Sequence, residues 1–129
     1  MTFTHAARRL ALLLPLAAAS PATAQEAGGD PIAGEALWPR CAACHALDEA
    51  RNGAGPHLVG LVGRPIGGAD GFAYTPALAE SDLVWNEETL AAYLLAPRDI
   101  LPGTRKAGVL TDPQDIADVV AFLAERTTE

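Results

Sequence analysis

Two cysteines and a histidine lie within five residues, in the order Cys41-Ala42-Ala43-Cys44-His45. Two thiols three positions apart, with a histidine directly after the second, form the C-x-x-C-H pattern of covalent c-type haem attachment. Because the cysteines are less than one helical turn apart, they can bond to the two vinyl groups of one porphyrin. His45 would then lie beneath the ring and offer an imidazole nitrogen to the iron. The motif therefore predicts one haem c, attached through Cys41 and Cys44, with His45 as an axial ligand.

Three other uses of this motif fit the sequence less well. A zinc site needs four soft or borderline ligands, and beyond the N-terminal segment the chain offers only Cys41, Cys44, His45 and His57. A thioredoxin-type redox pair would lie at a strand-to-helix junction of a βαβ unit, and no such pattern surrounds the motif. A plain disulfide would explain the cysteines but not the histidine. These remain the alternatives to haem attachment.

The first 24 residues have the order of a secretory signal peptide. Arg8 and Arg9 form a charged start, residues 10–19 are apolar, and Ala22-Thr23-Ala24 is a small-x-small cleavage site. The apolar run is too short to span a bilayer, so we expect residues 1–24 to be removed; an uncleaved anchor is the alternative. Because bacteria attach c-type haem beyond the inner membrane, export predicts a periplasmic protein with no stable membrane insertion after cleavage.

Residues 25–129 are then one small domain of 105 residues. The formal net charge of the whole chain is −7, and it becomes −9 without Arg8 and Arg9. Such an acidic surface argues against nucleic acid or an anionic membrane as the partner. It favours transient redox partners with a basic docking patch, although simple solubility explains it equally well. We expect the protein to be a monomer.

Helix signals begin shortly before the motif. Asp30 can cap a helix whose first residue is Pro31 and which runs towards Cys44. Pro39 lies inside this helix and removes a backbone donor, which predicts a kink. The Gly-rich stretch 46–82 lacks sustained periodicity and is expected to be loop.

Two more helices are indicated downstream. Asn86 can cap a helix whose dipole Glu87 and Glu88 complement, and Pro97 should end it. Another helix should begin at Asp112-Pro113. Its apolar residues recur at helical spacing, at Ile116, Val119, Val120 and Leu123. Because strand signals are essentially absent, the sequence predicts a small all-α, loop-rich fold.

The sequence resembles class I cytochromes c over nearly the whole of residues 25–129. Gly34 and Trp38 stand seven and three residues before Cys41, where the family has a glycine and an aromatic residue. In the family this helix crosses the C-terminal helix, and Ala121-Phe122-Leu123 is similar to the matching stretch. The other similar segments are Gly55-Pro56-His57-Leu58, Gly60-Leu61-Val62-Gly63-Arg64, Gly71-Phe72-Ala73-Tyr74-Thr75, Trp85, Tyr93-Leu94, Pro97 and Pro102-Gly103-Thr104. The resemblance implies the small cytochrome c fold, with three to four helices and long loops around one covalently attached haem.

The resemblance also implies roles for residues around the haem. The carbonyl of Pro56 would accept a hydrogen bond from Nδ1–H of His45, which fixes the ring and raises its basicity. Arg64 and Trp85 would hydrogen-bond a buried propionate, whose charge would otherwise be unpaired in a medium of low dielectric. Tyr74 would assist them.

Two aromatic residues and one histidine carry alternatives. The resemblance places Tyr93 beside the haem, but Tyr93 and Trp85 would also suit an ordinary aromatic core. His57 occupies a position that varies in the family, so we expect it at the surface or the haem edge rather than on the iron.

The chain departs from the family at one position. In the family, the loop after Pro-Gly-Thr presents a methionine that binds the iron on the face opposite the histidine. Here Pro102-Gly103-Thr104-Arg105 leads to Lys106 at that position. The only methionine is Met1, which signal cleavage would remove. The mature chain therefore has no thioether to bind the iron.

Three outcomes are open for the second axial position of the iron. Lys106 binds as a neutral amine, or it swings out and leaves an open or water-bound iron, or another residue moves in. Holding a lysine deprotonated at pH 7 costs roughly 4.6 kcal/mol, which a bond to ferric iron can exceed. A hard amine favours Fe(III), whereas a soft thioether stabilises Fe(II). Ligation by Lys106 therefore predicts a low reduction potential, and a solvated Lys106 beside Arg105 is the plain alternative.

These outcomes separate two functions. In the first, the protein is a periplasmic monohaem electron carrier that works through an exposed haem edge and binds its redox partners transiently. In the second, an open or labile distal site binds small ligands such as NO and CO, or gives weak peroxidase activity. A peroxidase needs a distal acid–base group, and within 98–110 only Asp99 is one. We therefore favour the carrier and expect no enzyme activity.

Overall fold

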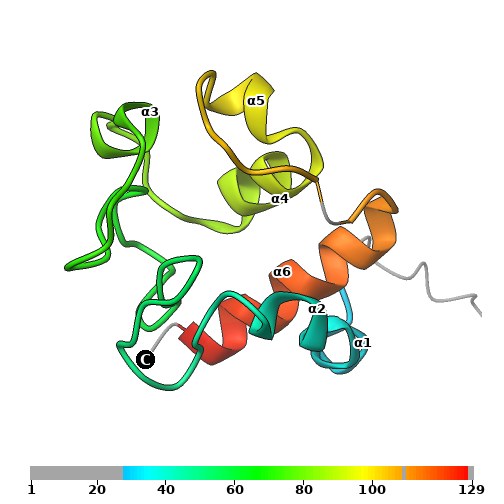
Figure 1. Ribbon diagram of the computed structural model, residues 1–129. Coiled ribbons are helices and arrows are strands. Elements are labelled where there is room, and N and C mark those ends of the chain that lie inside the picture. The colour runs from blue at the N-terminus through cyan, green and yellow to red at the C-terminus, as the bar shows by residue number, and fades with distance from the viewer. Residues whose placement is uncertain (1–27, 109, 128–129) are drawn as a thin grey trace, which may run out of the picture.

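The computed structural model describes residues 28–108 and 110–127, so the predicted signal peptide 1–24 lies outside the described residues. Six helices are formed within these ranges: α1 (Pro31–Leu37), α2 (Pro39–Ala42), α3 (Pro76–Ala79), α4 (Glu87–Leu95), α5 (Pro97–Ile100) and α6 (Pro113–Thr127). No strand occurs in 28–108 or 110–127, where extended pairing is limited to two isolated bridges, His45 with Asn52 and Pro65 with Val84. The predicted all-α, loop-rich fold is confirmed (Figure 1).

The helix before the C-x-x-C-H motif is broken where the kink was predicted. Asp30 caps α1 by accepting a hydrogen bond from the N–H of Ile32, and Pro31 is the first helical residue. Trp38 separates α1 from α2, which begins at Pro39 because this residue cannot donate to the helix before it. Since α2 ends at Ala42, Cys44 and His45 lie just past the helix.

The cap predicted for α4 is present as a capping box. The side chain of Asn86 accepts a hydrogen bond from the N–H of Thr89 at 2.8 Å, and Thr89 Oγ1 accepts one from the N–H of Asn86 at 2.9 Å. These two bonds satisfy donors that the first helical turn leaves free.

Two short helices were not predicted from the sequence. Helix α3 lies within the stretch 46–82 that was expected to be loop, and α5 starts at Pro97, which was expected only to end α4. Each has four residues and a proline at its first position. Four residues make barely one turn, so they cannot show the periodicity on which a helix prediction depends.

Helices α1 and α6 cross closely and form the base of the molecule (Figure 1). At the crossing, a Cβ on Gly34 would overlap the carbonyl oxygen of Asp118 and lie 2.8 Å from Cβ of Phe122. The rings of Trp38 and Phe122 pack beside it with centroids 6.1 Å apart. Gly34 is therefore required by the close approach of the two backbones.

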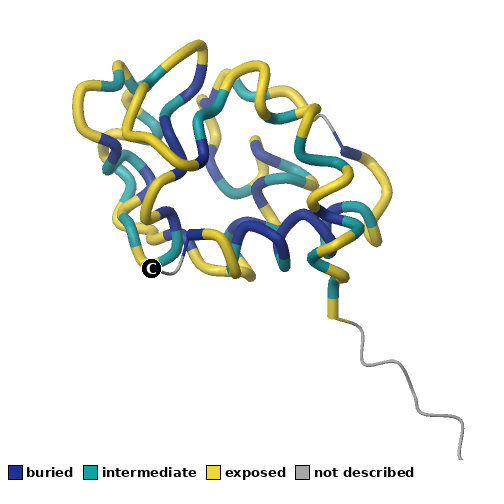
Figure 2. The backbone as a smooth tube through the Cα atoms, turned by 90° about the horizontal axis from the view of Figure 1, so that it is seen from below, coloured by how far each residue is buried: buried dark blue, intermediate teal, exposed yellow. Residues whose placement is uncertain are grey.

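Helix α6 supplies much of the core. The apolar residues that predicted this helix, Ile116, Val119, Val120 and Leu123, are all buried, and Figure 2 shows the buried positions along it. Helix α4 packs against α6 and α5, while the chain between α2 and α3 forms the left side of the view in Figure 1. No helix in 28–108 or 110–127 has the length and apolarity needed to cross a membrane.

Candidate haem-binding site

A cavity of about 630 Å³ lies between α6, α4 and the loops. It brings together all nine residues that the sequence analysis assigned to the haem. Its lining includes Cys41, Cys44, His45, Pro56, Arg64, Tyr74, Trp85, Tyr93 and Lys106. The remaining wall is mostly apolar, with Leu58, Leu61, Ile66, Leu90, Val119 and Leu123 among its residues. The space is thus suited to a large apolar group with a few polar attachment points.

The attachment motif forms one wall of the cavity. Cys41 is half-buried, Cys44 is exposed, and their thiols are not joined in a disulfide. Burial raises the pKa of the Cys41 thiol, although Lys106 and Arg40 oppose this shift through their positive charges. No group of three or more His, Cys, Asp or Glu side chains within 28–108 and 110–127 is placed to hold a metal ion. The zinc and disulfide alternatives therefore find no support in the structure.

His45 is held against the loop that follows the motif. Its Nδ1 lies 2.7 Å from the carbonyl oxygen of Pro56, so Nδ1 carries the proton and donates. Gly55 lies so close that a Cβ there would come within 2.8 Å of the same Nδ1. With Nδ1 engaged, Nε2 is the nitrogen that remains to bind a metal.

Arg64 brings a hydrogen-bond donor without a partner to the cavity. Its Nη1 donates to the carbonyl of Val59 and its Nη2 to the carbonyl of His57, both at 2.9 Å. The Nε atom is buried and has no hydrogen-bond partner. Burial also lowers the pKa of Arg64, against a smaller opposing effect of Tyr74. A buried, unpaired guanidinium N–H on the wall of a cavity is the environment that an anionic group would satisfy.

The sequence analysis did not assign Thr75 to the site. Its Oγ1 is buried without a hydrogen-bond partner, and the residue lines the same cavity as Arg64. The signal available in the sequence was its place at the end of the similar segment 71–75. Only the fold shows that its hydroxyl is free, because a surface threonine would be hydrated.

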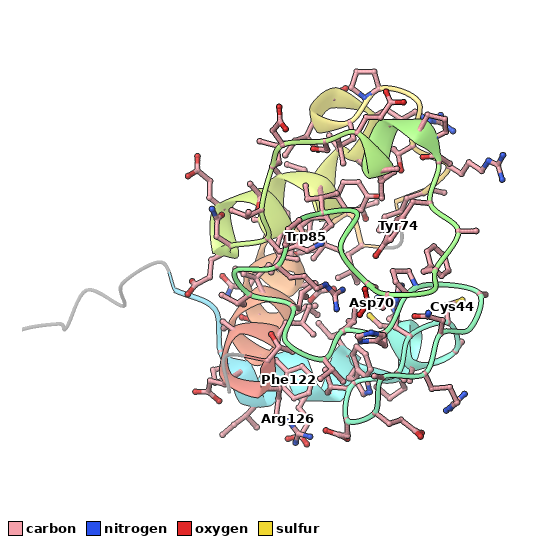
Figure 3. All side chains as sticks on the ribbon, turned by 90° about the vertical axis from the view of Figure 1, so that its left-hand side faces the viewer. Cys44, Asp70, Tyr74, Trp85, Phe122 and Arg126 are labelled. Atoms are coloured by element: carbon pink, nitrogen blue, oxygen red, sulfur yellow. The ribbon has the colours of Figure 1, made fainter. Side chains whose placement is uncertain are left out.

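Five aromatic residues line the cavity, and three of them, Tyr74, Trp85 and Tyr93, were assigned to the site from the sequence. Trp85 and Tyr93 are 6% and 8% exposed, and their rings meet edge to face with centroids 5.1 Å apart. Both belong to the hydrophobic core and both line the cavity, so the two alternatives for them coexist. The hydroxyl of Tyr74 accepts a hydrogen bond from the N–H of Ala69 at 3.0 Å. In Figure 3, Trp85 and Tyr74 lie above Asp70 and Cys44.

Lys106 lies in the lining of the cavity and is only partly exposed. Its backbone N–H donates to Thr104 Oγ1 at 3.3 Å, and this hydroxyl also bonds the hydroxyl of Tyr93 at 2.8 Å. The Nζ atom donates to the carbonyl of Ala107 at 3.1 Å and lies 5.8 Å from the centroid of the Tyr93 ring. Burial lowers the pKa of Lys106, whereas the charge of a Cys41 thiolate opposes this. A thioether at Cys41 carries no charge, so attachment leaves burial as the dominant effect.

We expected His57 at the surface or the haem edge rather than on the iron, and the structure corrects the first of these two places. His57 is only 8% exposed and is not part of the cavity lining. Its backbone N–H donates to Asn52 Oδ1 at 3.1 Å, and its Nδ1 is 3.5 Å from Nη1 of Arg64. Burial and the charge of Arg64 lower the pKa of His57, while Asp70 raises it. His57 thus lies beside Arg64 and outside the cavity lining.

The residues present fit a covalently bound haem. The cysteine pair and an oriented imidazole line a cavity with an apolar wall, and Arg64 and Thr75 contribute buried polar atoms that lack partners. These unpaired atoms match the acidic groups that a haem carries, while the apolar wall matches its ring.

Comparison with known proteins agrees with this arrangement. The Cytochrome c family matches residues 32–127. Cytochrome c2 of Rhodomicrobium vannielii is 44% identical over 100 residues, covering 76% of this chain and 80% of that protein. Cytochrome c2 of Rhodoblastus acidophilus is 46% identical over 99 residues, covering 75% and 92%.

A solved structure supports the same assignment at the level of the fold. Cytochrome cH from Methylobacterium extorquens superposes with a TM-score of 0.68 at 39% identity, covering 75% of this chain and 99% of that one. The chain therefore belongs to the cytochrome c family and is a class I c-type cytochrome, in which Cys41 and Cys44 attach one haem c.

Proposed function

We propose that this protein is a periplasmic monohaem electron carrier. The observation that carries the proposal is the composition of the cavity, in which the attachment motif meets an apolar wall and the described lining holds no carboxylate. Among the described lining residues, His45 is the only histidine, and its Nδ1 is already bonded to Pro56. Such a site supplies a redox cofactor without a free histidine or a carboxylate to serve as a distal acid–base group. Its relatives named cytochrome c2 and cytochrome cH support the same function.

The location in the cell follows from the predicted processing. We infer that residues 1–24 are a signal peptide and that residues 25–129 form the exported cytochrome domain. Covalent haem attachment to the cysteine pair supports export, since bacteria carry it out beyond the inner membrane. The bacterial cytochrome c2 relatives are consistent with this location.

We infer a role toward the haem for each polar residue of the cavity. Bound haem supplies the one-electron chemistry. His45 would bind its iron through Nε2 while Pro56 fixes the orientation of the imidazole. Arg64 would donate Nε–H to a propionate, with Trp85, Tyr74 and Thr75 lining the same region. Tyr93 would pack near the distal loop through its bond to Thr104.

We further propose that Lys106 is the second axial ligand. Its place in the cavity lining and the lowering of its pKa by burial both favour an uncharged amine. Because an amine donor prefers ferric iron, this ligand predicts a reduction potential below that of a His/Met protein of the same fold.

One observation favours a second candidate function, a labile distal site that binds NO or CO. In the structure Nζ of Lys106 is engaged by the carbonyl of Ala107 and the face of Tyr93. Lys106 also lines a separate pocket of about 240 Å³ next to α5. Because Lys106 borders both the cavity and this second pocket, its side chain can leave the iron without rearrangement of the loop. Weak peroxidase activity belongs to the same candidate.

The absorption spectrum of the ferric protein tests the choice between these functions. Ligation by Lys106 predicts a low-spin spectrum without a sulfur–iron band, and Lys106→Ala should convert it to high spin. A high-spin wild-type spectrum with rapid CO uptake after reduction would instead support the labile site. A colourless protein with the mass of the apoprotein would contradict haem attachment and with it the proposed function.

The sign of charge around the cavity bears on the redox partner. The chain is acidic overall, but within the described lining every charged residue other than the motif is basic: Arg40, Arg64, Arg105 and Lys106. The exposed residues of the lining include small apolar side chains, at Ala54, Ala73 and Ala107. Small side chains permit close approach, and local charge governs short-range docking more than net charge does. We therefore propose that a transient partner docks here through an acidic surface, in place of the basic patch inferred from net charge.

Arg40 and Arg105 are the exposed basic residues of the cavity lining and form its basic rim. Reversing the charge of this basic rim gives a prediction. Arg40→Glu with Arg105→Glu should slow oxidation of ferrous protein by ferricyanide about tenfold at low ionic strength, because the anionic probe is no longer attracted. Stopped-flow absorbance measures the rate. Two control changes of equal sign, Arg51→Glu and Arg126→Glu, lie outside the cavity lining and should have a smaller effect. Equal slowing in both pairs would mean that net charge, not the rim, controls the encounter.

A further inference from the structure

His57 is a buried imidazole to which the proposed function gives no role. Its ring is almost excluded from solvent, and it lies outside the cavity on the far side of Arg64. Buried polar side chains normally serve a partner. The partner of His57 is the guanidinium of Arg64, which lines the cavity.

The contacts between the two residues fix the direction in which Arg64 points. Nη2 of Arg64 donates to the carbonyl of His57, Nη1 donates to the carbonyl of Val59, and Nη1 is also 3.5 Å from Nδ1 of His57. Since arginine cannot accept a hydrogen bond, only an unprotonated Nδ1 can accept in this contact. The tautomer that makes the contact is thus the neutral ring with its proton on Nε2. These contacts engage both terminal nitrogens, and Nε is the buried nitrogen that has no partner.

We propose that His57 is a positioning residue for Arg64 and that its charge state couples the reduction potential to pH. This inference rests on the proposed role of Arg64 beside a haem propionate and on the proposed electron transfer. A protonated His57 cannot accept from Nη1, and it places a second positive charge next to the guanidinium. Protonation of His57 thus removes a hydrogen bond that orients Arg64, and it adds positive charge behind the cavity wall.

The sign of the coupling follows from electrostatics. The oxidised site carries one more positive charge than the reduced site, so it binds the His57 proton less tightly. The pKa of His57 is therefore lower in the oxidised protein than in the reduced protein. Between the two values, the uptake of one electron is accompanied by the uptake of one proton from solvent by His57. The potential falls as pH rises through this window and is flat above it.

Two charged groups act on the His57 ring within the described residues, Arg64 and Asp70. Arg64 disfavours the imidazolium, and Asp70 favours it. Asp70 is held near through its backbone carbonyl, which accepts a hydrogen bond from Nδ2 of Asn52, and Asn52 Oδ1 accepts from the N–H of His57. Burial and Arg64 together shift the window below the ordinary value of 6.5.

Potentiometry of the holoprotein from pH 4.5 to 8 tests the inference. A threefold to tenfold difference in proton affinity between the two redox states corresponds to a fall of about 30 to 59 mV across the window. His57→Gln keeps an acceptor for Arg64 but cannot titrate, so it should retain the wild-type potential at pH 8 and lose the slope. His57→Leu lacks the acceptor and should shift the potential at pH 8 as well. A flat wild-type profile, or a slope that survives in His57→Gln, would overturn the inference.

Two further measurements keep the test decisive if a variant fails to fold. Residues 25–129 contain only His45 and His57, and His45 is engaged by Pro56, so NMR can follow His57 alone in both redox states. Equal pKa values in the two states would refute the coupling. Arg64→Gln separates the failures: if its potential equals that of wild type, the proposed role of Arg64 is wrong, whereas a changed potential with a flat wild-type profile refutes only the role of His57.

Discussion

Lys106→Met is expected to raise the reduction potential by about 120 mV, which corresponds to a hundredfold change in the relative stability of the two redox states. The side chain at this position lines the cavity next to Tyr93 and Thr104. A thioether is a soft ligand that favours Fe(II), whereas an amine is a hard ligand that favours Fe(III).

Potentiometry and the ferric absorption spectrum measure this effect together. The variant should gain the long-wavelength band of a sulfur–iron bond, and the wild type should lack it. Arg105→Met is the matched control, since it introduces the same side chain at an exposed neighbouring position of the same loop. If Lys106→Met changes neither spectrum nor potential, the loop 102–108 does not present position 106 to the iron.

Gly34→Ala is expected to destabilise the folded protein by about 3 kcal/mol, the upper part of the range for overpacking a tight contact. The added Cβ would overlap the carbonyl oxygen of Asp118. Backbone atoms in a packed helix cannot turn aside as a flexible side chain can, so α1 and α6 must move apart. Alanine's better helix propensity recovers only about 1 kcal/mol of this.

Urea unfolding of the holoprotein, followed by far-ultraviolet circular dichroism, measures the loss. Gly28→Ala is the control, because a Cβ at Gly28 meets nothing within 4 Å. We expect its free energy of unfolding to match that of wild type to within about 0.5 kcal/mol. A Gly34→Ala protein as stable as the Gly28→Ala control would show that the helix crossing is not a tight constraint.

Several elements were predictable because their signals are local in the sequence. The cap at Asp30, the break at Pro39 and the cap at Asn86 depend on side chains within a few residues of the backbone groups that they satisfy. The buried stripe of α6 follows from helical spacing alone. Helices α3 and α5 were missed because one turn has no periodicity.

The cavity residues likewise fall into those that local sequence could assign and those that it could not. The attachment motif is complete within five residues, so Cys41, Cys44 and His45 could be assigned without a fold. Thr75 and the burial of His57 could not be assigned, because both depend on chain segments that meet only in three dimensions. The basic rim was hidden for the same reason, since an acidic composition says nothing of where the few basic side chains gather.

By itself, the sequence determined the cofactor, its covalent attachment and the absence of a methionine from residues 25–129, and it predicted the proximal imidazole. All of these depend only on residue type and short spacing, because covalent attachment needs reactive side chains that are close together in the sequence. Only the tertiary structure decided that Lys106 lines the cavity, that Arg64 brings an unpaired Nε–H to it, and that His57 stands behind Arg64. Burial and hydrogen-bond satisfaction depend on which distant segments exclude water together, and the local sequence does not contain that information.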